Sequence, residues 1–154
     1  MIQRDYIERL IQQVVQTLAA MLRLRESGET DRALRAAHET EELVLGPDHQ
    51  LLVRMEATTL VSMVGRYELD RVRLYAVLVG EEGVTHDAAG DGDAAGRCYV
   101  RALELLAAAS LAGCRLDPAD RERVADLAGK VDVESLEVRY RTRIGRIVAG
   151  DDLS

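Results

Sequence analysis

The sequence predicts an all-α protein, and three observations support this fold class. Ala, Leu, Arg and Glu dominate the composition, and all four are strong helix formers. Apolar residues recur at three- and four-residue steps through most of the chain, as on the buried face of a helix. Glycine and proline interrupt this pattern at intervals that suit short connections. Because 154 residues suffice for one core, we expect about seven helices in a single domain over residues 1–150, followed by a frayed tail at 151–154.

The first helix is predicted to run to about Glu26, where residues 27–28 (Ser-Gly) end it. Thr30 or Asp31 then caps a second helix, which residues 46–48 (Gly-Pro-Asp) end, because proline cannot continue the hydrogen-bond ladder. The first helix has an unusually wide apolar stripe. It consists of Ile2, Tyr6, Ile7, Leu10, Ile11, Val14, Val15, Leu18, Met21 and Leu22.

Residues 49–65 allow two interpretations. They are rich in β-branched side chains, which favour a strand. No other segment offers this strand a partner, so we expect a short helix that Gly65 ends.

Four further helices are expected in the second half of the chain. Asp117 and Pro118 form a strong start signal, with a capping residue followed by proline in the first turn. The expected helices begin at about Glu68, at Asp91 or Asp93, at Asp117 and at Asp132, and the middle two end near Gly113 and Gly129.

Small and aromatic residues follow a repeat-like spacing between the fourth and fifth of these helices. Ala95 lies twelve residues after Gly83, Tyr99 four residues later, and Ala102 three residues after that. This spacing resembles the tetratricopeptide repeat, a helix-turn-helix unit of ~34 residues. The resemblance implies that Ala95 packs against Gly83 where two helices come closest, that Tyr99 fills the space between repeats, and that Ala102 lets the next helix approach.

The resemblance covers residues 76–113 and implies a short right-handed α-solenoid of antiparallel helical hairpins. A fainter copy precedes it, with Gly28, Ala33 and Ala37 in the places of Gly90, Ala95 and Tyr99. At four positions the residue differs from the one typical of the tetratricopeptide repeat. They are Val79, Glu82, His86 and Ala107.

The chain also resembles a family of uncharacterised bacterial proteins with tetratricopeptide-like folds. The likeness rests on residues 4–11 (RDYIERLI), on Gly28 with residues 33–34 (Ala-Leu), and on Leu43 with Gly46. It implies a fold and no activity.

Composition excludes several classes of function. The formal net charge of −7 opposes binding to nucleic acid or to an anionic membrane. No segment reaches the ~18 uncharged apolar residues of a membrane span, and the polar N-terminal segment makes a poor signal peptide. Cys98 and Cys114 cannot pair within one helix, because their separation along it exceeds the reach of a disulfide. We therefore expect a cytoplasmic protein with free thiols.

Candidate catalytic and metal sites are each better explained as structure. Residues 87–93 (DAAGDGD) read as a turn with a capping aspartate, not as a calcium or nucleotide loop. The histidines fall in different segments, and neighbouring glutamates within one run diverge around a helix. The histidines are His38, His49 and His86; the glutamate runs are Glu39, Glu41 and Glu42, and Glu81 and Glu82. We expect no catalytic residue, no cofactor and no metal.

The leading hypothesis is a non-enzymatic helical scaffold or adaptor that binds a protein or peptide, with Tyr75, His86 and Arg101 lining its groove. The wide stripe of the first helix suggests a homodimer as one form of this hypothesis. A second hypothesis is a small-ligand-binding protein or enzyme with a polar pocket of Glu82, His86 and Asp87.

A third hypothesis is nucleic-acid binding through an arginine stripe on the last helix. Arg139, Arg143 and Arg146 recur there at helical spacing, with Arg141 nearby, and would contact phosphates or an acidic partner. The alternative is a solvated edge, or pairing with acidic residues such as Glu134 and Glu137, which we favour because of the net charge.

Overall fold

The computed structural model describes residues 2–151 and 153, and this part of the chain is all-helical, with no strand. Asp152 and Ser154 of the predicted tail lie outside the described residues, as does the side chain of Ile2. The α-helices are α1 (Ile2–Glu26), α2 (Thr30–Leu45), α3 (His49–Leu52), α4 (Ala57–Val64), α5 (Leu69–Ala88), α6 (Gly92–Leu111), α7 (Pro118–Ala128) and α8 (Val138–Ala149). Short 3₁₀ turns occupy Arg66–Glu68 and Val133–Ser135.

The eight α-helices exceed the predicted seven because residues 49–65 form two helices. The helical interpretation of this segment is confirmed, and the strand alternative is wrong. Glu56 separates α3 from α4 and caps α4, since its carboxylate accepts the backbone N–H groups of Thr58 and Thr59 at 2.9 and 3.4 Å. This side chain satisfies donors that a helix start otherwise leaves free.

The predicted helix ends agree best with the structure where residues adjacent in sequence set them. Asp117 caps α7 in a reciprocal capping box with Asp120, and Gly46 ends α2 with a φ of 82°. Two predicted caps are wrong. The N-cap of α2 is Glu29 rather than Thr30 or Asp31, and Asp132 precedes a 3₁₀ turn, because extended backbone at Leu136 delays α8 until Val138.

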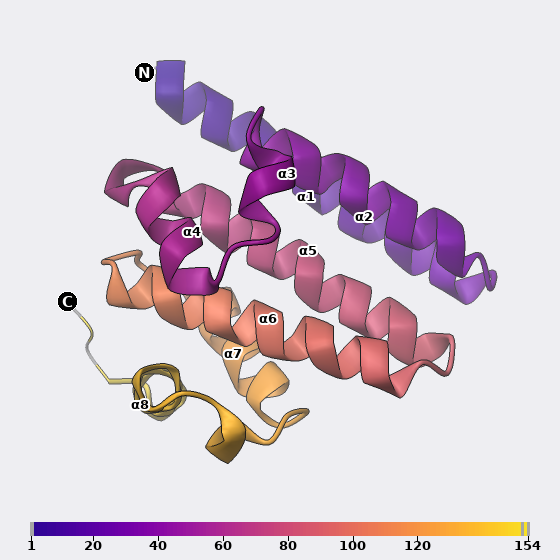
Figure 1. The fold of residues 1–154 in the computed structure, drawn as a ribbon. Coiled ribbons are helices and arrows are strands. Elements are labelled where there is room, and N and C mark those ends of the chain that lie inside the picture. The colour runs from indigo at the N-terminus through magenta and orange to yellow at the C-terminus, as the bar shows by residue number, and fades with distance from the viewer. Residues whose placement is uncertain (1, 152, 154) are drawn as a thin grey trace.

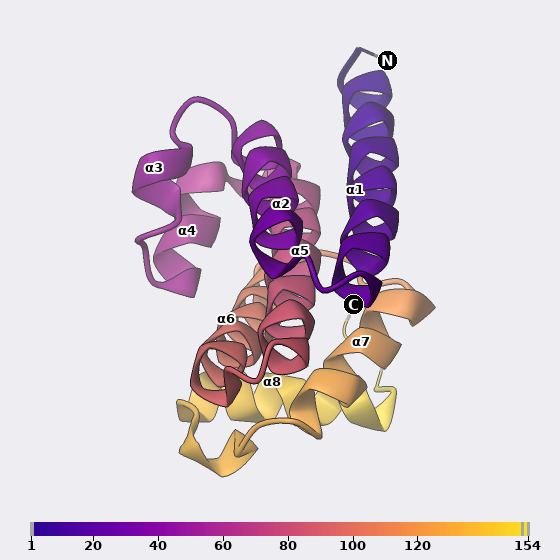
Figure 2. The same ribbon diagram turned by 90° about the vertical axis from the view of Figure 1, so that its right-hand side faces the viewer.

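Helix α5 is the centre of the molecule. It packs along α6 and also contacts α1, α2 and α4, as the two ribbon views show (Figure 1, Figure 2). Helices α7 and α8 pack together on α6 (Figure 2), and α7 also reaches α5, where Arg73 pairs with Asp120 at 3.4 Å. Nearly every side chain from Leu69 to Thr85 is buried or half-buried, so polar groups on this helix meet other helices instead of water.

The closest approach of α5 and α6 differs from the predicted register. A Cβ atom added to Gly83 would lie 2.5 Å from Cε1 of Tyr99 and 3.2 Å from Cβ of Cys98. Gly83 is therefore a point of close contact, but its nearest neighbours are Tyr99 and Cys98 instead of the predicted Ala95. The reason is that α5 continues to Ala88, and the chain turns only where Gly90 takes a φ of 83°.

The turn between α5 and α6 agrees with the prediction for residues 87–93. The carboxylate of Asp91 caps α6 by accepting the backbone N–H of Ala94 at 3.1 Å. None of the helices described here is long and apolar enough to cross a membrane.

Candidate functional site

Helices α2, α5 and α6 together form a polar hollow of about 340 Å³, which we call the α2–α5–α6 hollow. It is lined by Glu41, Val53, Tyr75, Val79, Glu82, His86, Ala94, Arg97, Cys98 and Arg101. The members from α5 recur at steps of three or four residues, and those from α6 fall on three adjacent turns at positions 94, 97, 98 and 101. Each helix therefore presents one face to the hollow.

The α2 and α5 walls carry two buried carboxyl groups. Glu41 and Glu82 are only 7% and 8% exposed. Oε2 of Glu41 and Oε1 of Glu82 are fully buried without a hydrogen-bond partner among the described residues. The pKa of the Glu41 carboxyl is raised far above its usual range. Burial is the largest cause, and the hydrogen bond to Glu82 and the negative charge of Glu82 add to it. The Glu41 carboxyl therefore keeps its proton at neutral pH.

His38 adjoins this carboxyl pair from α2. It precedes Glu41 by three residues, which places both side chains on one helix face. Its Nε2 lies 3.6 Å from Oε2 of Glu82, and the hydrogen bond to Glu82 raises the pKa of the imidazole. One ligand atom from each of His38, Glu41 and Glu82 lies within 4.8 Å of the other two. Two carboxylates and an imidazole are a donor set that divalent metal ions accept.

The α6 wall of the hollow is basic. The guanidinium of Arg101 lies 5.9 Å from the ring centroid of Tyr75, and its buried Nη2 has no hydrogen-bond partner in the part of the chain that the structure describes. In the described part of the chain, no ion pair joins Arg97 or Arg101 to the carboxyl pair. Acidic and basic side chains thus line one hollow without pairing directly among the described residues.

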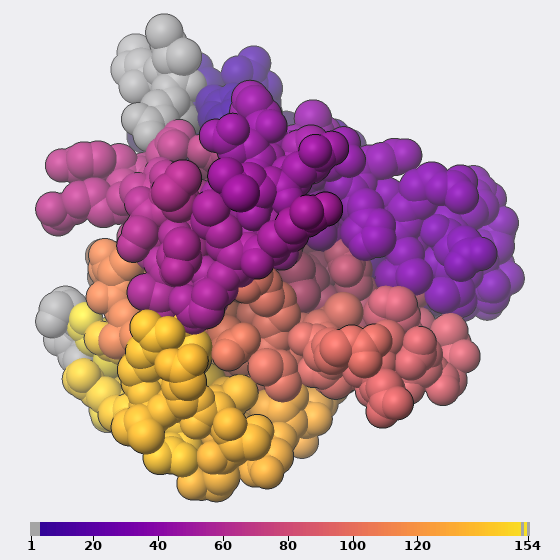
Figure 3. Space-filling view, viewed as in Figure 1, coloured from indigo at the N-terminus to yellow at the C-terminus, as the bar shows by residue number. Residues whose placement is uncertain are grey.

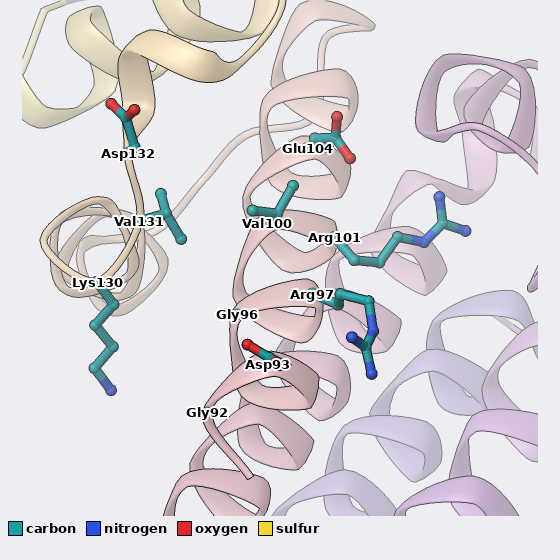
Figure 4. Close-up of a pocket in the computed structure, with 10 residues that line it drawn as sticks. All are labelled: Gly92, Asp93, Gly96, Arg97, Val100, Arg101, Glu104, Lys130, Val131 and Asp132. Carbon is teal, nitrogen blue, oxygen red and sulfur yellow. The ribbon is translucent and has the colours of Figure 1, made fainter.

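A larger pocket of about 470 Å³ lies between α6 and the segment after α7. Figure 4 shows that Arg97 and Arg101 extend from α6 away from Lys130, Val131 and Asp132, toward the helices of the N-terminal half. None of the buried carboxyl oxygens without a partner belongs to a residue that lines this pocket. In the space-filling view, the N-terminal helices lie directly beside α6 on one face of the molecule (Figure 3). The α2–α5–α6 hollow is therefore the better candidate site.

The structure brings three of the predicted partner-binding residues together. Tyr75, His86 and Arg101 all line the hollow, although Tyr75 is buried, and burial raises the pKa of its hydroxyl to about 12. Asp87, predicted to share a pocket with Glu82 and His86, is not among the lining residues. Its carboxylate instead accepts a hydrogen bond of 2.6 Å from the Tyr99 hydroxyl.

The arginine stripe of α8 lies outside the hollow, and acidic groups pair with most of it. Arg139 contacts Glu137 at 2.9 Å and Glu56 at 3.2 Å. Arg146 lies 3.7 Å from Asp151, and the neighbouring Arg141 lies 3.5 Å from Glu134. The predicted pairing with Glu134 and Glu137 is thus present. Arg143 is half-buried, and its Nη1 has no hydrogen-bond partner among residues 2–151 and 153.

The two cysteines are free and half-buried. Burial is the main reason that the pKa of each thiol, Cys98 and Cys114, is raised to about 11. Both thiols are therefore protonated and poor nucleophiles at neutral pH.

Sequence reasoning missed the convergence of His38, Glu41 and Glu82. Neighbouring carboxylates within one glutamate run do diverge around the helix, as predicted. The pair forms between runs, because α2 packs on α5. The three-residue spacing of His38 and Glu41 is the one local signal that could have indicated half of the cluster.

Comparisons of the chain with protein-family models, with curated proteins and with solved structures gave no match.

Proposed function

We propose that this protein binds a small polar ligand in the α2–α5–α6 hollow. The observation that carries the proposal is the pair of buried carboxyl groups, Glu41 and Glu82, each with one oxygen that has no hydrogen-bond partner among the described residues. An unpaired buried polar group costs about 1–3 kcal/mol, so such groups are unusual unless another molecule satisfies them. The proposal is one of binding, not catalysis.

The two walls of the hollow define the class of ligand. A positive group would neutralise the carboxyl pair, and a negative group would pair with Arg97 and Arg101, which offer forked donors to a carboxylate. The volume of about 340 Å³ is at the lower end for small-molecule sites. A small zwitterion such as a free α-amino acid satisfies the charge and the size.

Thermal unfolding with a panel of ligands tests this proposal. Free α-amino acids at millimolar concentration are compared with amines that lack a carboxylate and with carboxylates that lack an amine, all in the presence of a chelator. At least one amino acid is expected to raise Tm in proportion to its concentration, since a ligand at a hundred times its Kd stabilises by about 2.7 kcal/mol. The two kinds of truncated analogue are expected to have little effect.

Four variants locate the binding. Glu82→Gln and Arg101→Gln should abolish the ligand-induced rise in Tm. Glu39→Gln and Arg35→Gln make the same changes at exposed positions of α2 and should retain it. The proposal is wrong if no member of the panel raises Tm, or if the rise survives both substitutions in the hollow.

We also propose that the fold is a short right-handed α-solenoid of antiparallel, tetratricopeptide-like hairpins that acts as a scaffold, with a second copy of the chain as its partner. Exposed apolar side chains on α1 support this second function. Val15 and Leu22, two turns apart, are 60% and 48% exposed. Light scattering tests the dimer. A mass of 17.0 kDa at every protein concentration would rule it out, and Val15→Glu should dissociate any dimer that forms.

A further inference from the structure

Nitrogen and oxygen donors from two helices converge beside the α2–α5–α6 hollow. His38 and Glu41 come from adjacent turns of α2, and Glu82 comes from α5. Their ligand atoms lie within 4.8 Å of one another, and Nε2 of His38 is 3.6 Å from Oε2 of Glu82.

The burial of this cluster indicates that it is more than a group of surface acids. The Glu41 side chain has an oxygen with no hydrogen-bond partner, and the residue is more than nine-tenths buried at 7% exposure. Glu82 repeats the arrangement from the opposing helix. Two carboxylates at this depth require a positive charge or a shared proton.

We propose that His38, Glu41 and Glu82 bind a divalent first-row transition-metal ion. The proposal goes beyond the binding of a small ligand, because it adds His38, which does not line the hollow, and assigns metal coordination to the carboxyl pair.

The donor set selects the class of metal. An imidazole with two carboxylates suits Zn²⁺, Mn²⁺, Fe²⁺ or Co²⁺, whereas Ca²⁺ takes six to eight oxygen ligands and Mg²⁺ keeps most of its waters. Bonds of about 2.1 Å require donors roughly 3–4 Å apart. The side chains must therefore close slightly around the ion. The His38 side chain is 61% exposed, so it is free to move and leaves a path for the metal.

Binding must release protons. Carboxyl and imidazole groups bind a metal through deprotonated atoms, so any proton held by Glu41 or His38 passes to the solvent. The negative charge of Glu42 on α2 also raises the pKa of the His38 imidazole. The other titratable or charged groups that face the cluster from the hollow are Tyr75, His86, Arg97, Cys98 and Arg101.

Calorimetric titration of the chelator-stripped full chain with ZnCl₂ or MnCl₂ tests the proposal. Two buffers with different ionisation enthalpies report the number of protons released. We expect one ion per chain and a net release of protons, because metal ligands must be deprotonated. CaCl₂ and MgCl₂ should bind at least about tenfold more weakly.

Matched variants decide whether this cluster is the site. Glu41→Gln, Glu82→Gln and His38→Ala should each weaken binding by about tenfold or more, and Glu39→Gln should bind like the wild type. Circular dichroism shows whether each variant folds. Equal affinity in Glu39→Gln and Glu41→Gln, or no binding of either metal by the wild type, overturns the proposal.

The metal experiment is independent of the amino-acid panel. An amino-acid effect in the chelator without metal binding rejects the metal site and leaves the proposed function intact. Metal binding without an amino-acid effect rejects the proposed function and leaves the metal site intact.

Discussion

Gly83 and Tyr99 meet where α5 and α6 come closest, and the tyrosine ring occupies the space of the absent side chain. A Cβ atom at position 83 would lie 2.5 Å from Cε1 and 2.7 Å from Cδ1 of Tyr99. The ring is held from its other end, because its hydroxyl donates a 2.6 Å hydrogen bond to Asp87. The ring therefore cannot swing away without losing that bond.

Gly83→Ala should destabilise the protein. Alanine is the better helix former by about 1 kcal/mol, but inserting a methyl group into a packed contact costs typically about 1–3 kcal/mol. We expect a net loss in the free energy of unfolding, measured by urea denaturation. Gly96→Ala on α6 is the matched control, since a Cβ atom there meets nothing within 4 Å and should stabilise. An equal gain in both variants would contradict the contact.

Helix ends were predictable where neighbouring residues determine them. Asp117 and Pro118 mark the start of α7, and Gly46 marks the end of α2, because their capping groups lie within one turn of the ends they cap. The register between α5 and α6 was not predictable, because it depends on where α5 stops. Spacing alone predicted a contact from Gly83 to Ala95, whereas the extension to Ala88 brings Tyr99 there.

The candidate site was also predictable only in part. Tyr75 and Arg101 were expected to line one groove, and they line the same hollow. Glu41 and Glu82 belong to separate helices, and only the packing of α2 on α5 brings them together. A single sequence carries no local signal for that contact.

Glu41→Gln should change how stability depends on pH. The folded chain holds the Glu41 proton to a pH well above 4.5, whereas the unfolded chain releases it near that value. The unfolded state therefore binds fewer protons above this pH, and the wild type loses up to about 1.4 kcal/mol per pH unit from this group. Glutamine has no proton to lose, so the variant should gain stability relative to the wild type as the pH rises.

Urea denaturation between about pH 5 and pH 8 measures this difference. His38 acts in the same direction, because its raised pKa adds stability that is lost as the pH rises through the folded value. Comparison with Glu39→Gln, an exposed position on the same helix, corrects for the change in net charge. Parallel pH profiles for Glu41→Gln and the wild type would show that Glu41 is ionised in the folded protein.

Thr17 of α1 and Thr40 of α2 share a buried hydrogen bond of 2.6 Å, and the two residues are 5% and 3% exposed. Thr17→Val keeps the shape but leaves the Thr40 hydroxyl without this partner, so it should lower the free energy of unfolding by about 1–3 kcal/mol. Replacing both residues by valine removes both polar groups and should restore most of that loss. A double-mutant cycle from urea denaturation gives the coupling energy. If the single and double variants are equally destabilised, the hydroxyls do not depend on each other, and apolar packing alone holds α1 against α2 at this point.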